Sequence, residues 1–395
     1  MARKYYIIGI TDDAELEPTS AVLKIIAENK VFSGGLRHHQ LVEKFLPLGA
    51  TWIDITVPLD GVFDAYKAHQ EIVVFASGDP LFFGFAGTVQ RRDPEAIIEV
   101  FPTFNSLQLL AHRSLLPYEG MRTLSLTGRP WKRFEQALIE GEPLMGVLTD
   151  RNKTPNAIAQ RMLDYGYNNY RMIVGENLGN ALERVAEYSI EEVAQRSFSM
   201  PNCLILKQTH PRHRPLGIPE SDFALLDGRA KMITKMPIRL LSLAALDLRS
   251  HQTLWDVGFC TGSVSIEAKL QFPHLEIISF EQREAGRALM ETNTRRFGTP
   301  GITAVIGDFM KMDLAGYPRP DAVFIGGHGG QLVSMIQRID RYLTEGGVVV
   351  FNSVSPESRE AFYEGAESCK WKIVSSQHIS LDEHNPITIL KAVKP

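Results

Sequence analysis

The sequence contains few cysteines, no long apolar run and little net charge. Its three cysteines, Cys203, Cys260 and Cys369, are widely spaced and odd in number, which argues against a disulfide framework and against a zinc site. We therefore expect no metal and a reducing, cytoplasmic setting. No apolar run approaches the roughly 20 residues of a membrane-spanning helix, and the opening MARKYYIIGI lacks the features of a signal peptide. The net charge of −4 gives no general support for a nucleic-acid partner, and we expect no membrane partner.

The length of 395 residues exceeds what one hydrophobic core usually holds, so two domains are expected. Strand-like apolar runs alternate with helical periodicity throughout, which is typical of the α/β class. The segment HPRHRPLGIPE interrupts this alternation, and its three prolines cannot lie inside a helix or a central strand. We predict a first domain over residues 1–208, a linker over 209–219 and a second domain over 220–395.

The apolar patterns predict individual strands and helices in both domains. The expected strands of the first domain are Tyr5–Ile10, Ile72–Ala76, Ile97–Phe101, Thr123–Leu126, Leu144–Leu148, Arg171–Val174 and Cys203–Lys207. Its expected helices are Pro18–Asn29, Asn105–Leu115, Trp131–Glu140 and Pro155–Asp164. The expected strands of the second domain are Thr253–Val257, Glu276–Phe280, Thr303–Ile306, Ala322–Ile325, Gly347–Asn352, Trp371–Ser376 and Ile387–Ala392. Its expected helices include Ala230–Leu248, Ser263–Gln271, Arg283–Phe297 and Gln331–Tyr342.

A glycine-punctuated corner, LWDVGFCTGSVSIEA, begins the second domain's alternation of strands and helices. Asp256, Gly258 and Gly262 lie where a strand turns into a helix, and glycine there lets the backbone approach a ligand closely. Glu281 ends the next strand, where a carboxylate can take both hydroxyls of a ribose. Asp308 follows the third strand and is placed to accept a hydrogen bond from an adenine amino group. The ordered set indicates an adenosine-bearing ligand over the carboxyl ends of a doubly wound sheet.

The run G-F-C-T-G-S differs from the G-x-G-x-x-G pattern that holds a dinucleotide pyrophosphate, although a turn for NAD remains an alternative. The segment resembles motif I of the class I methyltransferases, and Glu281 and Asp308 match that family's next two motifs. The resemblance implies a Rossmann-like domain that binds S-adenosylmethionine, with Thr234, Thr261 and Gly326 among the cofactor-binding residues.

The flanking segments MITKMPIRLLSLAAL and DAVFIGGHGG resemble a narrower group, the cobalamin-pathway enzymes that methylate C15 of a precorrin and remove its ring C acetate carboxylate. This resemblance covers roughly residues 218–391. It implies a broad, shallow floor for a bulky substrate, with Lys235 and Gly327 in contact with it. His328 is the candidate catalytic residue, either to protonate the carbon that CO2 leaves or to orient the acetate. The alternative for His328 is a loop histidine without a chemical role.

The first domain carries a different pattern, EIVVFASGDPLFFGFAG, in which an acid and a proline follow a buried strand. It resembles the GDP motif of the tetrapyrrole methylases, and FPTFNSLQLLAHRSLLPYEG resembles the next segment of that family. SLTGRPW and GENLGNALERV extend the match, which covers about residues 4–207. The resemblance implies a two-lobed fold that binds S-adenosylmethionine between its lobes, with Asp79, Phe82, Ser106 and Leu107 near the cofactor.

The first domain departs from this family at its opening loop. The family has G-x-G-P-G-D after the first strand, whereas this chain has GITDDAELEP, in which Asp12 and Asp13 add negative charge. That loop lines the acceptor groove in the family. The departure therefore leaves open the alternative that this domain is degraded and kept only for docking or stability.

The fusion of the two patterns resembles the decarboxylating C5,15-methyltransferases of corrin-ring construction. A precorrin carries many carboxylates, so Arg37 and Arg129 are candidates to bind it, with a solvated surface as their alternative. The families also imply a homo-oligomer. Two other functions remain open, an RNA methyltransferase and a cofactor-binding protein whose first domain is silent.

Overall fold

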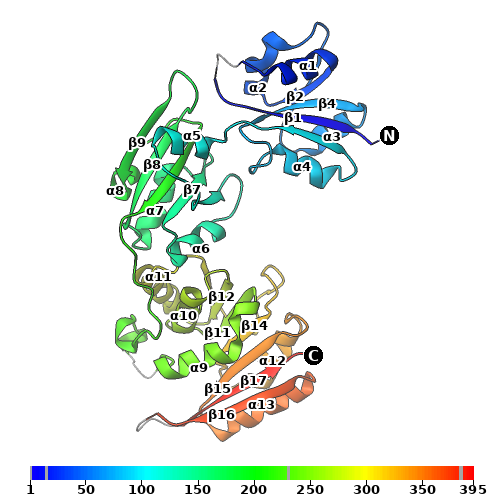
Figure 1. Cartoon of the computed structure of the whole chain (residues 1–395). Coiled ribbons are helices and arrows are strands. Elements are labelled where there is room, and N and C mark those ends of the chain that lie inside the picture. Colours follow the sequence, from blue (N-terminus) through cyan, green and yellow to red (C-terminus); the bar gives the residue numbers. More distant parts are fainter. Residues whose placement is uncertain (1, 14–16, 229–231, 382–385) are drawn as a thin grey trace. The chain divides into compact units, whose positions relative to one another are not determined.

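The computed structural model describes residues 2–13, 17–228, 232–381 and 386–395. Backbone contacts divide the chain into two compact units (Figure 1). The N-terminal unit comprises residues 1–129, 143–160 and 169–210, and the C-terminal unit comprises residues 130–142, 161–168 and 211–395. The predicted α/β class is confirmed, whereas the predicted domain limits stay predictions. Among the described residues, no helix has the length and apolar character required to cross a membrane.

The N-terminal unit contains two five-stranded sheets, one in each lobe. The first sheet is parallel and has the order β3-β2-β4-β1-β5. Its strands are β1 (Lys4–Ile10), β2 (Val31–Gly34), β3 (Thr51–Asp54), β4 (Glu71–Ser77) and β5 (Ile97–Phe101). The second sheet is mixed and has the order β6-β7-β10-β8-β9. Its strands are β6 (Arg122–Ser125), β7 (Leu144–Leu148), β8 (Tyr170–Glu176), β9 (Arg184–Ser189) and β10 (Asn202–Gln208).

The helices of the N-terminal sequence region range from five to ten residues. They are α1 (Ser20–Glu28), α2 (Leu36–Val42), α3 (Asp60–Tyr66), α4 (Phe85–Arg92), α5 (Ser106–Arg113), α6 (Lys132–Glu140), α7 (Pro155–Asp164) and α8 (Ile190–Ala194). The helices α2, α3 and α8 and the strands β2, β3 and β9 were not predicted from the sequence. These helices span one or two turns, and β2 and β3 have four residues each, too few for either periodicity to stand out.

The C-terminal unit is built on one seven-stranded sheet with the order β13-β12-β11-β14-β15-β17-β16. Five strands are parallel, and β17 and β16 are antiparallel to their neighbours. The strands are β11 (Thr253–Val257), β12 (Glu276–Glu281), β13 (Ile302–Ile306), β14 (Ala322–Ile325), β15 (Val348–Ser353), β16 (Lys372–Ile379) and β17 (Ile387–Val393). The strand order reverses between β11 and β14, which confirms the doubly wound Rossmann-like fold.

Five α-helices among the described residues of the C-terminal sequence region accompany this sheet. They are α9 (Met236–Leu246), α10 (Ser263–Gln271), α11 (Ala285–Phe297), α12 (Leu332–Asp340) and α13 (Pro356–Ser368). The prediction that the first of them begins at Ala230 is wrong. Residues 229–231 lie outside the described residues, and the helix begins at Met236, with Pro237 in its first turn. Proline suits a helix start because its missing N–H is not needed there.

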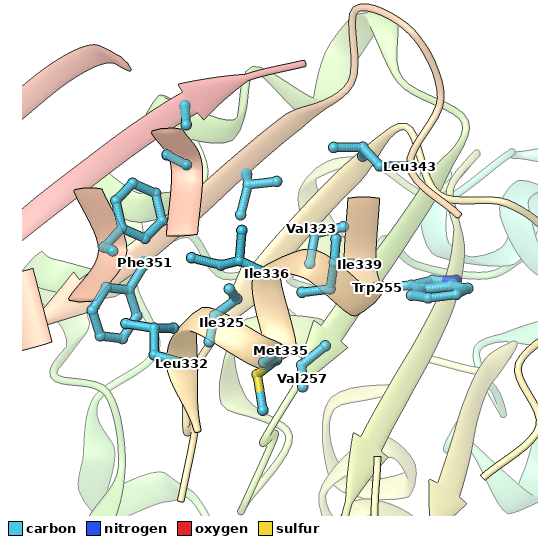
Figure 2. Packing of buried hydrophobic residues seen from close by; sticks show 14 of the residues in the cluster. Trp255, Val257, Val323, Ile325, Leu332, Met335, Ile336, Ile339, Leu343 and Phe351 are labelled. Carbon is cyan, nitrogen blue, oxygen red and sulfur yellow. The ribbon is translucent and has the colours of Figure 1, made fainter. Parts of the chain in front are cut away.

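One face of α12 fixes this helix on the sheet (Figure 2). Leu332, Met335, Ile336 and Ile339 recur every three or four residues, so they share one face of the helix, and each is at most 5% exposed. They pack in one core cluster with residues of β11, β14 and β15. Labelled strand partners in Figure 2 are Trp255, Val257, Val323, Ile325 and Phe351. This packing holds the loop between β14 and α12 over the carboxyl end of the sheet.

Candidate functional sites

A cavity of about 450 Å³ lies at the carboxyl ends of β11, β12 and β14 in the C-terminal unit. Its position is the one expected for a ligand of a doubly wound sheet, next to the reversal of strand order. Most residues predicted for this site line the cavity together. They are Thr234, Asp256, Gly258, Thr261, Glu281, Asp308, Gly326, Gly327 and His328. Lys235 and Gly262 are not among its lining residues.

The bare backbone at Gly258 has a structural cause that the sequence did not reveal. Gly258 has a φ of +82°, and a Cβ built there would lie 2.6 Å from the backbone nitrogen of Gly327. The two glycine loops, after β11 and after β14, therefore touch each other through their backbones. Gly262 packs against a side chain instead, since a Cβ there would lie 2.5 Å from the Met290 sulfur. Gly258 therefore shapes the cavity wall by close backbone contact, whereas Gly262, which does not line the cavity, makes room for Met290.

Asp256 is a buried carboxyl group whose hydrogen bonds are incomplete. Its Oδ2 accepts a hydrogen bond from the Ser265 hydroxyl at 2.6 Å, whereas Oδ1 has no hydrogen-bond partner among the described residues. Burial raises the pKa of Asp256 to about 7. The buried hydroxyl of Thr261, also in the cavity lining, likewise has no partner in the described part of the chain. Because buried polar groups are rarely left unpaired, these two atoms fit a polar ligand group.

Glu281 holds the glycine corner in place. One carboxylate oxygen accepts the backbone N–H of Cys260 at 3.0 Å, and the other accepts that of Arg283 at 3.1 Å. A carboxylate has about four lone-pair positions, so Glu281 keeps acceptor capacity for the hydroxyls of a ribose. Asp308 accepts the backbone N–H of Met310 at 2.9 Å. This hydrogen bond is the main cause that lowers the pKa of Asp308, which therefore lines the cavity as a carboxylate.

His328 has a defined orientation in the loop after β14. Its Nδ1 lies 3.2 Å from the backbone nitrogen of Gly330, and its ring stands edge-to-face with Phe351 at 5.7 Å. An amide N–H can only donate, so Nδ1 is the acceptor and the neutral ring carries its hydrogen on Nε2. Burial lowers the pKa of His328, which favours this neutral form. His328 is thus a hydrogen-bond donor at the cavity.

A buried ion pair positions the segment before α9. Arg239 and Glu267 are fully buried, with Nε and Oε2 3.1 Å apart. Arg239 also donates to the backbone oxygen of Thr234 at 2.9 Å, and Glu267 accepts the backbone N–H of Gly217 at 2.7 Å. Charged residues on a helix usually indicate an exposed face, so no sequence pattern marks such a pair. The pair keeps Thr234 in the cavity lining.

A second cavity of about 450 Å³ lies in the N-terminal unit, bordered by both of its lobes. Of the residues predicted for this domain, Phe82, Ser106 and Arg37 line it. Asp79, Leu107 and Arg129 are not among the lining residues. The Asp79 carboxylate accepts the backbone N–H of Leu81 at 2.8 Å and so closes the turn after β4.

Leu107 and Arg129 have contacts of their own in this unit. The Leu107 side chain is fully buried in the core. The Arg129 guanidinium donates to the Ser125 hydroxyl at 2.7 Å and lies 5.3 Å from the ring centre of Phe83, which lines the cavity. The binding roles of Asp79, Leu107 and Arg129 stay predictions.

The altered opening loop brings Asp12 into this second cavity. Asp12 forms an ion pair with Arg37, with Oδ1 3.2 Å from Nε, and it accepts a hydrogen bond from Asn180 of the other lobe at 3.1 Å. The loop that departs from the tetrapyrrole methylase pattern therefore links an arginine of the cavity to the second lobe. In the described ranges no three His, Cys, Asp or Glu side chains gather as a metal site would require.

Comparisons with known proteins agree with both halves of the chain. The family model "Tetrapyrrole (Corrin/Porphyrin) Methylases" matches residues 6–194, and "Precorrin methyltransferase domain" matches residues 227–395. A structure of precorrin-6Y C5,15-methyltransferase from Geobacter metallireducens GS-15 is 31% identical, with a TM-score of 0.42. The match covers 46% of this chain and 98% of that chain.

Two curated relatives extend these matches. The cobalt-precorrin-6B C(15)-methyltransferase (decarboxylating) of Salmonella typhimurium is 38% identical over 35% of this chain and 70% of its own length. A precorrin-6Y C(5,15)-methyltransferase (decarboxylating) from a Sinorhizobium species is 32% identical over 89% of this chain and 84% of its own length. With the two-lobed first unit, the doubly wound second unit and a cavity in each, this similarity shows that the chain is a methyltransferase of the precorrin-6Y C5,15-methyltransferase (decarboxylating) family.

Proposed function

We propose that the chain methylates precorrin-6B, or its cobalt form, at C5 and C15 with S-adenosylmethionine and removes the carboxylate of the ring C acetate. The observation that carries this proposal is the presence of two cavities of about 450 Å³, one in each unit. Each has the size of a small-molecule site. They lie in a chain whose Sinorhizobium relative, similar over 89% of this chain, is named for both methylations.

The residues of the C-terminal cavity fit S-adenosylmethionine, which supplies an electrophilic methyl group when bound. The unpartnered Oδ1 of Asp256 and the Thr261 hydroxyl suit the cofactor's amino-acid end. Glu281 offers acceptors to the ribose, and Asp308 offers one to the adenine amino group. In the N-terminal cavity, Phe82 and Ser106 take part in holding the second cofactor.

The protein's contribution to methyl transfer is alignment and exclusion of water. A bridging carbon of a reduced tetrapyrrole is electron-rich because of the neighbouring pyrrole nitrogen, so it needs no strong base. The family's glycine loop, with Gly326 and Gly327 exposed at the C-terminal cavity, leaves a low floor for a broad substrate. Arg37 offers a cation to a carboxylate ligand in the N-terminal cavity, and Arg129 and Lys235 are candidates to bind the carboxylates of the macrocycle.

His328 orients the acetate before CO2 leaves, and the electron pair of the broken carbon–carbon bond passes into the macrocycle. With Nδ1 accepting from Gly330, the neutral ring presents Nε2–H as a donor to a carboxylate. Protonation of the product carbon would require the imidazolium form of His328. In that form Nδ1 carries a hydrogen as well as Nε2, and the hydrogen on Nδ1 would face the N–H of Gly330. The geometry therefore supports orientation over general-acid catalysis.

The two other functions fit the cavities less well. An RNA methyltransferase needs several basic side chains along its cleft, whereas among the described residues Arg283 is the only lysine or arginine in the lining of one cavity and Arg37 in that of the other. A first unit without activity would not require a cavity of about 450 Å³ that is lined by Arg37 and Ser106.

Product counting tests the proposal. Purified protein is supplied with precorrin-6B, with and without cobalt, and with methyl-labelled cofactor, and the products are analysed by mass spectrometry. We expect two methyl groups and one CO2 for each macrocycle, and His328→Ala should slow CO2 release while both methyl groups are still transferred. A single methyl group would show that one unit is silent, and no methyl transfer at all would refute the proposal.

A further inference from the structure

A small group of polar side chains interrupts the apolar wall of the N-terminal cavity. Aromatic rings such as Phe75 and Phe104 form much of that wall. Arg37 and His38, from the first turn of α2, meet Ser77 at the carboxyl end of β4. Polar groups placed in an apolar cavity usually fix the orientation of a ligand.

The hydrogen bonds of His38 determine where its ring hydrogen lies. The backbone N–H of Gly35 donates to Nδ1 at 3.2 Å, so the neutral ring carries its hydrogen on Nε2. Nε2 lies 2.8 Å from the Ser77 hydroxyl oxygen and therefore donates to it. Burial, together with the charge of Arg37, lowers the pKa of His38 to about 4, although Asp12 and a backbone oxygen of Phe75 oppose the shift. The ring is neutral near pH 7.

Ser77 receives two hydrogen bonds and must donate its own hydrogen elsewhere. Besides the bond from His38, its oxygen accepts one from Nη2 of Arg37 at 3.2 Å. A serine hydroxyl has two lone pairs and one hydrogen. Because both lone pairs are occupied, the O–H group of this exposed residue is a donor in the cavity lining.

Arg37 adds further donors beside this hydroxyl. A guanidinium has five N–H groups. Two are directed to Asp12, at 3.2 and 3.4 Å, and one to Ser77. The described residues supply no acceptor for the remaining N–H groups. Asp12, itself held by Asn180, keeps the guanidinium in this orientation.

We propose that Ser77 and Arg37 form a carboxylate-binding subsite of the N-terminal cavity, with His38 and Asp12 as positioning residues. The proposal rests on the proposed function, because it assigns a ligand group to the same cavity. Hydroxyl and guanidinium donors side by side suit a carboxylate, for which charge-assisted hydrogen bonds are strong. Two sources share this chemistry, a side-chain carboxylate of the tetrapyrrole and the carboxylate of the cofactor's methionine part.

The test compares Ser77→Ala with Ser77→Thr in the C5 reaction, followed with ¹³C-methyl-labelled cofactor and precorrin-6B. Loss of a hydrogen bond to a charged group corresponds to a change of about ten-fold or more. We expect Ser77→Ala to raise the KM of one ligand by that factor, and Ser77→Thr to restore most of it. A rise in the KM of the tetrapyrrole assigns the subsite to the macrocycle, and a rise in the KM of S-adenosylmethionine assigns it to the cofactor.

A double variant tests the positioning role of His38. His38→Leu frees a lone pair of Ser77, so it should raise the same KM less than Ser77→Ala does, with little effect on kcat. In the Ser77→Ala background, His38→Leu should cause no further rise in that KM, because His38 acts through the Ser77 hydroxyl, which Ser77→Ala removes. Additive effects of the two substitutions would overturn the positioning role.

The C-terminal unit supplies an internal control in every sample. Methylation at C15 and CO2 release should be unchanged in all variants, and Ser197→Ala, at an exposed position outside both cavities, should leave both KM values unchanged. Unchanged KM values for both ligands in Ser77→Ala would overturn the subsite. If the wild type transfers no methyl to C5, the proposed function fails there. In that case, equilibrium dialysis of the protein against precorrin-6B and S-adenosylhomocysteine tests the subsite without the reaction. Equal retention of each ligand by wild type and by Ser77→Ala refutes the subsite.

Discussion

Asp256 is a buried carboxyl group in the wall of the C-terminal cavity, and its protonation affects both stability and cofactor binding. Burial raises its pKa from the usual 3.8 to about 7. Between these two pH values the folded protein binds more protons than the unfolded chain, so this residue's contribution to stability falls as the pH rises from about 4 to 7. A cofactor amino group near Oδ1 would compensate for the buried charge.

Asp256→Asn should therefore stabilise the cofactor-free protein at alkaline pH. An amide stays neutral, so the free energy of unfolding of Asp256→Asn relative to wild type should rise by roughly 2–4 kcal/mol between pH 5 and pH 8. Denaturant unfolding at both pH values measures the difference. The same variant should bind S-adenosylhomocysteine more weakly in the C-terminal cavity.

The control is Asp313→Asn, since Asp313 is exposed and accepts the backbone N–H of Ala315 at 2.9 Å. The difference in the free energy of unfolding between Asp313→Asn and wild type, measured at the same two pH values, is the reference for an exposed site. If the difference between Asp256→Asn and wild type is the same at pH 5 and pH 8, Asp256 does not titrate as described.

Individual site residues could be predicted where a motif places a side chain at the end of a strand. Asp256 and Glu281 lie at the carboxyl ends of β11 and β12, and Asp308 follows β13, so the topology brings them to one cavity. Gly258 was also predicted, although its closest neighbour is the backbone of Gly327. Ser77 was missed because its role depends on which ring nitrogen of His38 carries hydrogen, and this property is not visible in the sequence.

At the scale of elements, the cavity of the C-terminal unit depends on contact between the loops after β11 and β14. Gly258→Ala would place a Cβ 2.6 Å from the Gly327 nitrogen, at a residue with a φ of +82°. Both loops would have to move. We expect a loss of stability of about 1–3 kcal/mol from the backbone strain and a weaker affinity for S-adenosylhomocysteine.

Gly346→Ala separates the loop contact from the backbone conformation. Gly346 has a φ of +71°, and nothing lies within 4 Å of its added Cβ. It should lose stability through conformation alone and keep its cofactor affinity, as measured by calorimetric titration. Equal affinities of Gly258→Ala and wild type would show that the loop contact does not shape the cavity.

Long, periodic elements could be predicted from the sequence, and short ones could not. The strand β4 was found because its central apolar run is buried between neighbouring strands, and α12 because its apolar residues recur on one face. The helix α8 spans only five residues, but its capping box of Ser189 and Glu192 was a usable signal. The start of α9 was misplaced because the apolar pattern extends into the residues before Pro237.

At the scale of the whole molecule, two unrelated folds carry cavities of about 450 Å³ in one chain. The proline-rich segment without periodicity predicts a linker over residues 209–219. The assignment of residues 130–142 and 161–168 to the C-terminal unit was not visible, because it depends on contacts made after folding. We propose that each unit binds its own methyl donor.

The number of cofactor molecules bound per chain shows whether both units bind a methyl donor. Equilibrium dialysis of the full chain against labelled S-adenosylhomocysteine should reach two molecules per chain at saturation, and Asp256→Asn should weaken one of the two sites and leave the other unchanged. Saturation at one molecule per chain, or no binding, would contradict the account.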